Sequence, residues 1–423
     1  MLRNARSACL LVLAVATSSA IAADWPGFRG PTGQGISNEK NLPIKWSAED
    51  NVAWKVKLPG GGASCPVTLG KHVYLTCYSG YGLDKKEPGK QENLRRHVFC
   101  INRADGKIVW SKEFMPLLPE HDYSRHESDY HGYAASTPIT DGDRLYVFFG
   151  KSGVYCLDLD GNQIWHSPVG KNFHGWGSGS SPMLHKNLLI VNGSSEAGQM
   201  VAFDKMTGKE AWRTPGIGSA WNTPLIVTTP EKEQELVISV NGRVLGINPD
   251  TGKELWRADG VKSYVCSSVV AHEGIVYATG GGNVTLAIKT GGRGEVSKTH
   301  TLWQAKKGSN ASSPLLHDGY LYWASESGGV LHCQDAKTGE FKYSERLKPD
   351  AGRIWASPVL ADGKLYYVSQ FKGVFVVAAQ PKFEVVAHNV FKDDNNRSNA
   401  SMAISDGQLL FRNDQYLYCI GKK

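Results

Sequence analysis

The densest run of side chains that could do chemistry lies between Pro119 and His131, where three histidines alternate with carboxylates. Such groups are ligands for zinc and other transition metals, so His121, His126 and His131 are candidate metal ligands. Their five-residue spacing matches neither the His-Glu-x-x-His pattern nor a zinc-finger pattern. We therefore expect a hydrogen-bonded polar lid here, with metal binding and ligand contact left as alternatives.

A second group of candidate residues lies mostly in the short segments that precede the copies of an internal repeat. Aromatic planes combined with Asn and Arg suit a sugar, a peptide or an anionic group, through stacking and charge-assisted hydrogen bonds. The candidate ligand-binding residues are His131, Tyr133, His174, Trp176, Trp221, Tyr264, Asn310, Arg353, Trp355, Arg397 and Asn399. The five positions before each copy contain no Asp or Glu, so we expect no carboxylate at this mouth. Alternatively, Trp221 and Trp355 only plug a channel.

The repeat itself is a Ser-Ser-Pro motif or a close variant, followed by an apolar strand. It returns after 72, 44, 42, 45, 45, 44 and 44 residues. Its anchor positions are Pro66, Pro138, Pro182, Pro224, Val269, Pro314, Pro358 and Met402. Strand-like segments and turn signals follow in the same order in most units, which predicts a four-stranded antiparallel sheet per repeat.

Turns and aromatic residues predict how these sheets contact one another. The turn at residues 204–209 has an Asp that can accept backbone N–H bonds and a Gly that allows positive φ. Most units end on a large aromatic residue, which can fill the gap between neighbouring sheets. The series is Trp54, Trp110, Trp165, Trp212, Trp256, Trp303 and Tyr343.

The two chain ends predict a closed ring. The eighth unit supplies three strands and the chain then ends at Lys423, whereas residues 46–58 look like the missing fourth strand. We therefore predict an all-β, eight-bladed β-propeller of four-stranded antiparallel blades, closed by the N-terminal strand. Such closure leaves no unpaired sheet edge. Residues 24–423 would form this one domain.

Two insertions make the first interval the longest. They span residues 78–97, between a second and a third strand, and 116–131, between an outer strand and the next inner strand. In a propeller of this connectivity both loops open on the same face. Because functional residues gather on loops held by a rigid scaffold, we expect this rim to bind the ligand.

The N-terminus has the order of a secretory signal peptide. Arg3 and Arg6 precede an apolar run and a small-residue stretch, so we assign residues 1–23 as a signal. The apolar run is too short to span a bilayer and no later stretch is long enough, so no membrane span is expected. A lipid-anchored protein needs a Cys directly after the cleavage point, whereas Ala23 and Asp24 stand there. We therefore do not expect a lipid anchor. A periplasmic or secreted location follows.

The net charge bears on the class of binding partner, and the cysteine count bears on disulfide pairing. The net charge is +7, or +5 without Arg3 and Arg6, and no run of five basic residues occurs. Nucleic acid is therefore not an expected partner. Cys9 lies in the signal, which leaves seven of the eight cysteines, so at least one should be unpaired. A monomer is expected.

The repeats and the opening Asp-Trp-Pro-Gly-Phe-Arg-Gly-Pro at residues 24–31 resemble a known family. They are similar to the quinoprotein-like propellers with Trp-docking repeats, in particular the exported bacterial group with pyrroloquinoline-quinone-like (PQQ-like) repeats. A more distant similarity is to the barrel-assembly scaffold lipoprotein of the outer membrane. The resemblance implies the fold and does not by itself imply a cofactor.

A quinone-dependent dehydrogenase of this family usually has a disulfide between adjacent cysteines, a calcium ion bound by oxygen ligands, and an Asp that acts as the catalytic base. The sequence has no adjacent cysteines. We therefore expect no cofactor, with PQQ and calcium as an alternative. The leading hypothesis is an exported, non-catalytic binding or scaffold propeller of the cell envelope, whose partner is an envelope protein, a peptide or a carbohydrate. A PQQ-dependent dehydrogenase and a carbohydrate-active hydrolase or lyase are the enzymatic alternatives.

Overall fold

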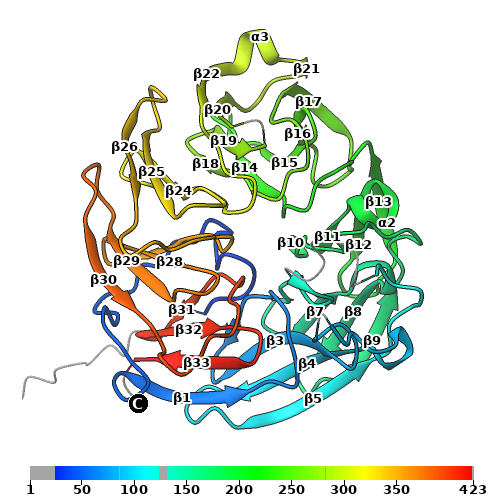
Figure 1. Cartoon of the computed structure of the whole chain (residues 1–423). Helices are drawn as coiled ribbons and strands as arrows, with labels where there is room; N and C mark the ends of the chain where they lie inside the picture. Colours follow the sequence, from blue (N-terminus) through cyan, green and yellow to red (C-terminus); the bar gives the residue numbers. More distant parts are fainter. Residues whose placement is uncertain (1–23, 85, 123–130, 282, 422–423) are drawn as a thin grey trace, which may run out of the picture.

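Each repeat forms one antiparallel sheet, and eight sheets stand like blades around a central axis (Figure 1). The computed structural model describes residues 24–84, 86–122, 131–281 and 283–421. In seven blades the strands follow chain order from the axis outwards, and in the eighth the first strand of the chain is outermost. The predicted eight-bladed β-propeller of four-stranded blades is therefore confirmed. The predicted signal peptide, residues 1–23, lies outside the described residues.

The first four blades follow the anchors at residues 66, 138, 182 and 224. Blade 1 comprises β2 (Val67–Leu69), β3 (His72–Ser79), β4 (Arg95–Asn102) and β5 (Ile108–Phe114); blade 2 comprises β6 (Ile139–Thr140), β7 (Arg144–Phe148), β8 (Val154–Asp158) and β9 (Gln163–Ser167); blade 3 comprises β10 (Met183–His185), β11 (Leu188–Gly193), β12 (Gln199–Asp204) and β13 (Glu210–Pro215); blade 4 comprises β14 (Leu225–Thr228), β15 (Gln234–Val240), β16 (Arg243–Ile247) and β17 (Glu254–Asp259).

The other four blades follow the anchors at residues 269, 314, 358 and 402. Blade 5 comprises β18 (Val270–His272), β19 (Ile275–Gly280), β20 (Val284–Lys289) and β22 (Thr301–Lys306); blade 6 comprises β23 (Leu315–His317), β24 (Tyr320–Ala324), β25 (Val330–Asp335) and β26 (Phe341–Arg346); blade 7 comprises β27 (Val359–Ala361), β28 (Lys364–Val368), β29 (Val374–Ala378) and β30 (Val385–Asn389); blade 8 comprises β31 (Ala403–Ser405), β32 (Gln408–Arg412), β33 (Tyr416–Ile420) and β1 (Val52–Lys57).

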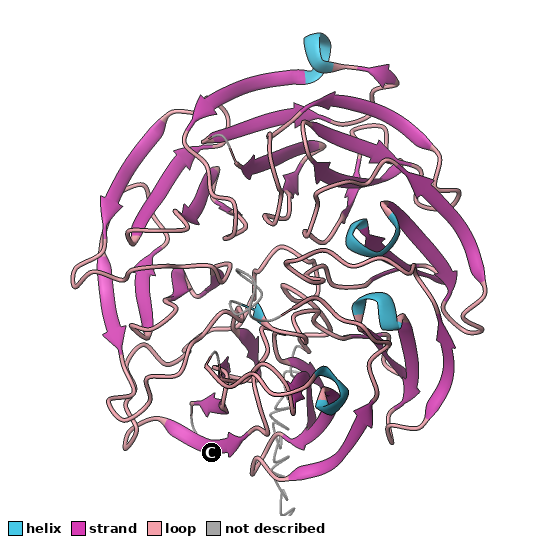
Figure 2. Ribbon diagram, turned by 45° about the vertical axis from the view of Figure 1, so that its right-hand side comes forward, coloured by secondary structure: helices cyan, strands magenta, loops and turns pink. Residues whose placement is uncertain are grey.

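In the described part of the chain, helical structure is confined to short segments, which Figure 2 shows among the strands. They are η1 (Gln91–Asn93), η2 (Gly150–Ser152), α2 (Ser194–Ala197) and α3 (Ser297–His300). A two-residue strand, β21 (Gly294–Glu295), adds to blade 4 in parallel with β17. Within the described residues, no helix is long and apolar enough to cross a membrane.

The ring closes through its two ends, as predicted. Strand β1 pairs antiparallel with β33, with Lys55 opposite Tyr418, so the first strand of the chain completes the last blade. Only residues 52–57 of the predicted segment 46–58 are extended in this way. Because β1 supplies the fourth strand of the last blade, this blade is complete and the ring is closed. A propeller avoids open sheet edges in this way.

Five tryptophans of the aromatic series dock their blade on the next, as predicted. The Trp54 Nε1 donates to the Arg103 carbonyl at 2.6 Å, and a Cβ at Gly106 would lie 2.8 Å from its ring. Trp110, Trp165, Trp212 and Trp303 repeat this bond to the carbonyls of Leu159, Lys205, Pro249 and Ala336. Trp256 differs, because β21 and α3 replace the corresponding turn of blade 5; its Nε1 donates to Glu235 within its own blade.

Residues 24–43, here called the leader, cross one end of the ring. They form hydrogen bonds with six blades. The contacts are Trp25 with Thr68, Pro26 with Thr140, Gln34 with Ala271, Arg29 with Pro314, Ser37 with Leu360 and Glu39 with Asp406. Several partners lie in or beside the turns between first and second strands, opposite the face that bears the insertions. The leader therefore closes one end of the channel.

Candidate functional site

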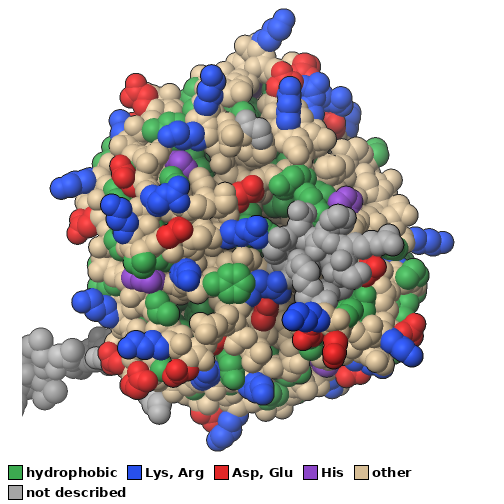
Figure 3. Space-filling model, in the orientation of Figure 1, with side chains coloured by type: hydrophobic (Ala, Val, Ile, Leu, Met, Phe, Trp, Pro, Cys, Tyr) green, Lys and Arg blue, Asp and Glu red, His purple; other side chains and the backbone are tan. Residues whose placement is uncertain are grey.

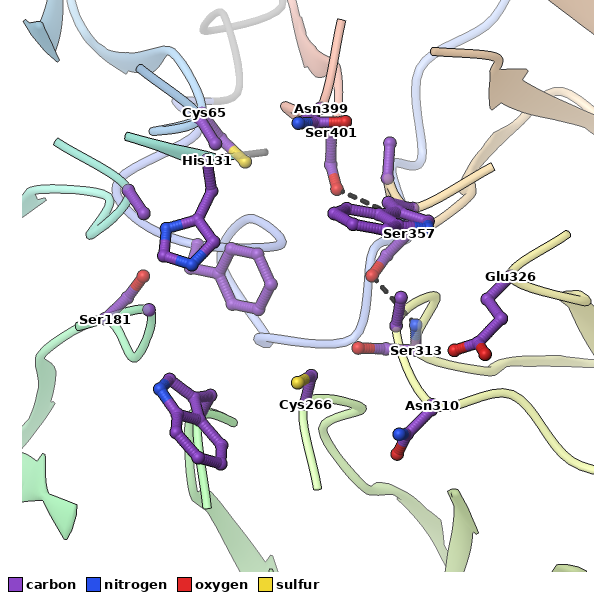
Figure 4. A pocket seen from close by; sticks show the side chains of 18 of the residues that line it. Cys65, His131, Ser181, Cys266, Asn310, Ser313, Glu326, Ser357, Asn399 and Ser401 are labelled. Carbon is purple, nitrogen blue, oxygen red and sulfur yellow. Dashed lines mark hydrogen bonds between the residues drawn. The ribbon is translucent and has the colours of Figure 1, made fainter. Parts of the chain in front are cut away.

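A ring of hydrogen bonds joins the blades around the axis. Each member is the residue directly before a repeat anchor, and in seven of the eight the backbone N–H donates to the side chain of the next member at 2.9–3.0 Å. The members are Cys65, Thr137, Ser181, Thr223, Ser268, Ser313, Ser357 and Ser401. The Ser401 N–H closes the ring by donating to the Cys65 thiol. We call this ring the girdle; Figure 4 shows part of it.

A central cup opens next to the girdle, with a volume of about 470 Å³. Because side chains alternate along an extended chain, residues two positions before the girdle point to the same side. These are Ala63, Ala135, Gly179, Trp221, Cys266, Ala311, Trp355 and Asn399, and all line the cup. Five of these positions, counting Cys266, hold small residues, and this leaves room for the cup. The three larger side chains, Trp221, Trp355 and Asn399, shape its wall.

The floor of the cup includes a residue of the leader, Phe28. The adjacent Arg29 anchors this segment, since its Nη2 donates to the carbonyls of Pro314 at 2.5 Å and Gln34 at 2.9 Å. Burial lowers the pKa of Arg29 to about 9. The cup is thus closed by the leader at one end and opens on the face that carries both insertions.

Eight of the eleven candidate ligand-binding residues line the cup: His131, Trp176, Trp221, Tyr264, Asn310, Arg353, Trp355 and Asn399. Trp176 is the centre of an aromatic cluster, with its ring 5.2 Å from Trp221 and 4.3 Å from Tyr264, the latter edge to face. Trp221 is held by a 2.8 Å bond from its Nε1 to the Gly177 carbonyl. These rings form a rigid wall on the side of blades 3 to 5.

The other three candidates lie outside the cup lining. Tyr133 is buried, and its hydroxyl donates to the His121 carbonyl at 2.8 Å. His174 packs edge to face on Trp221 at 4.8 Å. Arg397 forms a 2.8 Å ion pair with Asp414. These residues support the wall and rim of the cup.

The histidine-rich insertion is only partly described. His121 is buried against Tyr133, with ring centroids 4.4 Å apart, and His131 lines the cup; His126 lies outside the described residues. Burial lowers the pKa of His131 to about 4, so its ring is neutral near pH 7. No group of three His, Cys, Asp or Glu side chains within the described ranges is arranged to hold a metal ion.

The expectation of a mouth without carboxylates is wrong. Glu326 lines the cup, as Figure 4 shows. It lies in the loop between β24 and β25, and the predicted mouth was read from the segments between outer and inner strands alone. Both kinds of loop open on this face, so a search of both would have found it.

The two insertions are tied together on this rim, as their loop positions predict. The Gln91 Nε2 donates to the Glu120 carbonyl, and the Glu120 N–H donates back to Gln91 Oε1, both at 3.0 Å. Glu120 also forms a buried ion pair of 2.7 Å with Arg96 of β4. Beside this pair, burial raises the pKa of Glu196 to about 7. The rim therefore rests on a buried polar cluster.

The surface and the cysteines add two observations. On the face shown in Figure 3, Lys and Arg side chains are interspersed with Asp and Glu. All seven cysteines of the described residues are unpaired. The expectation of at least one unpaired cysteine is therefore confirmed. Cys65 and Cys266 line opposite sides of the cup.

Ring closure, Trp docking and the central cup define a β-propeller with PQQ-like repeats. The family model described as "Outer membrane protein assembly factor BamB" matches residues 36–174 and 94–345. The chain belongs to this family. No curated protein matches the chain significantly.

Solved structures with the same fold have low sequence identity. BamB from Moraxella catarrhalis is 15% identical with a TM-score of 0.53, over 75% of this chain and 82% of that one. The computationally designed Ika8 protein is 11% identical with a TM-score of 0.59, over 92% and 99%. The C-terminal WD40 domain of Sif2 is 11% identical with a TM-score of 0.57, over 87% and 97%. These similarities concern the fold.

Proposed function

We propose that this protein is an exported, non-catalytic binding propeller of the cell envelope that holds its ligand in the central cup and on the rim above it. The observation that carries this proposal is the cup itself. It is a cavity of about 470 Å³, within the range of about 300–1,000 Å³ typical of small-molecule sites. Aromatic walls and a few polar groups are the usual lining of such sites.

The rim supports a ligand larger than the cup. Two insertions meet above the wall and are fixed to it by the Arg96–Glu120 pair and the bonds of Gln91. A site held on a rigid scaffold loses little conformational freedom when it binds. A peptide, a protein loop or a carbohydrate chain could enter the cup with one end and contact the rim with the rest.

The family supports an envelope role. Its description is an outer membrane assembly factor, and the Moraxella catarrhalis BamB has the same fold. The charged, apolar and small-residue order of residues 1–23 is that of an export signal. We therefore place the mature chain in the periplasm or outside the cell.

The donor groups of the cup do not fit a calcium-bound quinone. Calcium takes six to eight oxygen ligands, usually including several carboxylates. Among the described residues lining the cup, Glu326 is the one carboxylate, and the lining cysteines belong to different blades. We therefore propose that the protein works without PQQ and calcium.

Equilibrium dialysis tests the binding function. The purified mature chain is dialysed against a soluble digest of bacterial envelope, and retained small molecules are identified by mass spectrometry. Ala135 and Ala311 line the cup, so Ala135→Trp and Ala311→Trp would fill it. We expect the wild type to enrich a ligand that both variants lose. Equal retention by all three proteins, or none by the wild type, would contradict the proposal.

Export is tested separately. The full chain is expressed with a C-terminal tag in a Gram-negative host, followed by fractionation and mass determination. A periplasmic product that begins at or next to Asp24 is expected, and an unprocessed cytoplasmic product would contradict export.

A further inference from the structure

From the charges and aromatic planes around the cup, we infer that its ligand is a short oligosaccharide carrying carboxylate groups, that is, a uronate. This inference rests on the proposed function and names the ligand class of the same site. Three sets of residues carry it: the aromatic wall, the hydroxyl girdle and the guanidinium groups on both sides of the girdle.

The aromatic wall suits the apolar face of a sugar ring. Trp176 lies in contact with both Trp221 and Tyr264, and Trp355 stands on the other side of the cup on blade 7. Aromatic rings bury apolar area at a low cost in conformational entropy, since they have two side-chain torsions. Phe28 adds another aromatic surface at the floor.

The girdle and the amides supply groups for sugar hydroxyls. Ser181, Ser313 and Ser357 line the cup, and each accepts one backbone N–H with its oxygen. A hydroxyl that accepts one bond retains an O–H donor. Asn310 and Asn399 add amide donors and acceptors.

The same geometry disfavours a peptide bound as an added strand. That mode needs an exposed strand edge. The inner strands are two to four residues long. The backbone N–H groups just before them donate to the girdle side chains. Recognition by side chains, as in sugar binding, fits the cup better.

Guanidinium groups make the cup favourable for anions. Arg353 lines the mouth with its guanidinium 5.8 Å from the Trp355 ring centroid. Beneath the girdle, Arg29 and Arg412 are each 1% exposed. Arg29 follows Phe28 of the cup lining, and Arg412 donates to the carbonyl of Ser64, the residue before Cys65 of the lining. Burial lowers the pKa of both. Since desolvation destabilises their charged forms, an anion in the cup would offset this cost.

The buried arginines are incompletely paired within the described structure. Arg29 uses Nη2 for two carbonyls, and its Nε and Nη1 meet no acceptor among the described residues. Arg412 uses Nη1 for Ser64 and Thr76, and its Nε and Nη2 likewise meet none there. Around the cup, the four guanidinium groups of Arg29, Arg353, Arg397 and Arg412 face two carboxylates: Glu326 of the lining, and Asp414, which pairs with Arg397 and also interacts with Arg412. A carboxylated sugar therefore matches the cup better than a neutral one.

Calorimetric titration with trigalacturonate and with its methyl ester tests the inference, since the ester keeps the shape and removes the charge. We expect trigalacturonate to bind saturably, the ester at least tenfold more weakly, and the affinity for the acid to fall as salt is raised. Equal affinity for acid and ester, or no binding of the acid, would overturn the inference.

Two variants locate the site. Arg353→Gln should weaken trigalacturonate at least tenfold. Arg346→Gln is the control, because Arg346 lies on β26 and contacts the Gly328 carbonyl outside the cup lining; it should bind as the wild type does. Unchanged binding in Arg353→Gln, with circular dichroism showing a folded protein, would contradict the assignment. If dialysis yields a peptide or a neutral glycan lost in Ala311→Trp, the binding function stands and the uronate inference fails.

Discussion

The Trp54 indole packs against Gly106, although β1, which carries the tryptophan, belongs to the last blade and the glycine to the first. A Cβ at Gly106 would lie 2.8 Å from the indole, and its φ is +73°. The Trp54 Nε1 also donates to Arg103 of the same blade at 2.6 Å. This contact therefore locks the junction at which the ring closes.

Gly106→Ala tests that junction. The left-handed backbone costs an L-residue about 1–2 kcal/mol, and overpacking costs about 1–3 kcal/mol more. Urea unfolding should show a loss of about 2–5 kcal/mol. Gly319→Ala is the matched control, with φ +78° and no atom within 4 Å of the added Cβ, and it should lose only the backbone part. Equal losses in the two variants would contradict docking by contact.

The girdle predicts a loss on removal of one hydroxyl. Ser357→Ala leaves the buried Ser313 N–H without its 3.0 Å acceptor, which costs about 1–3 kcal/mol. Cys65→Ser gives the first blade a hydroxyl like those of the other seven and should unfold at the wild-type urea concentration or above. If Ser357→Ala is as stable as the wild type, the girdle contributes nothing to closure.

Glu196 predicts a pH dependence of stability. Its pKa is raised to about 7 by burial, with Glu120 nearby adding to the rise and the Ser178 hydroxyl and Arg96 opposing it. The folded state therefore binds a proton that the unfolded state releases between about pH 4.5 and 7. Stability from this group is present at low pH and is lost as the pH rises through 7.

Glu196→Gln isolates this effect, because Gln keeps the shape and does not titrate. Between pH 5 and 8, thermal unfolding of the wild type should lose stability relative to the variant. His131, whose pKa is lowered to about 4, acts with the opposite sign below about pH 6.5 in both proteins, so it cancels in the comparison. Parallel pH profiles would contradict the raised pKa.

The cup predicts that binding and stability can be separated. Trp176 is half-buried, so Trp176→Ala should weaken ligand binding at least tenfold, with a smaller loss of stability than Trp25→Ala. Trp25 is 1% exposed and binds Thr68 through its backbone, but it does not line the cup. Paired titration and urea unfolding check both variants. Wild-type affinity in Trp176→Ala would exclude the aromatic wall from the site.

The sequence predicted the ring well because the repeat carries its own signals. Anchors, turns such as that at Gly208 and the aromatic residue that ends most units are local, and each copy confirms the others. The girdle was also visible in principle, since seven of the eight residues before the anchors are Ser or Thr. The cup wall followed from the same alignment.

The sequence prediction missed or misplaced residues of the cup whose positions do not follow from the repeat. Phe28 reaches the cup because the leader crosses the ring, which no periodicity indicates. Glu326 lies in a loop between second and third strands. Arg397 sits in an aligned segment, yet its ion pair with Asp414 holds it away from the lining. Long-range packing and ion pairing decide such positions.

Hydrogen exchange with and without bound ligand tests the central claim, that the cup is the binding site, most directly. The ligand is the molecule retained in dialysis, and the readout is amide protection by peptide. We predict protection in the segments around Cys65, Thr137, Ser181 and Trp355, which line the cup on four blades. Protection confined to outer strands such as β5 and β9, with these segments unchanged, would contradict the account.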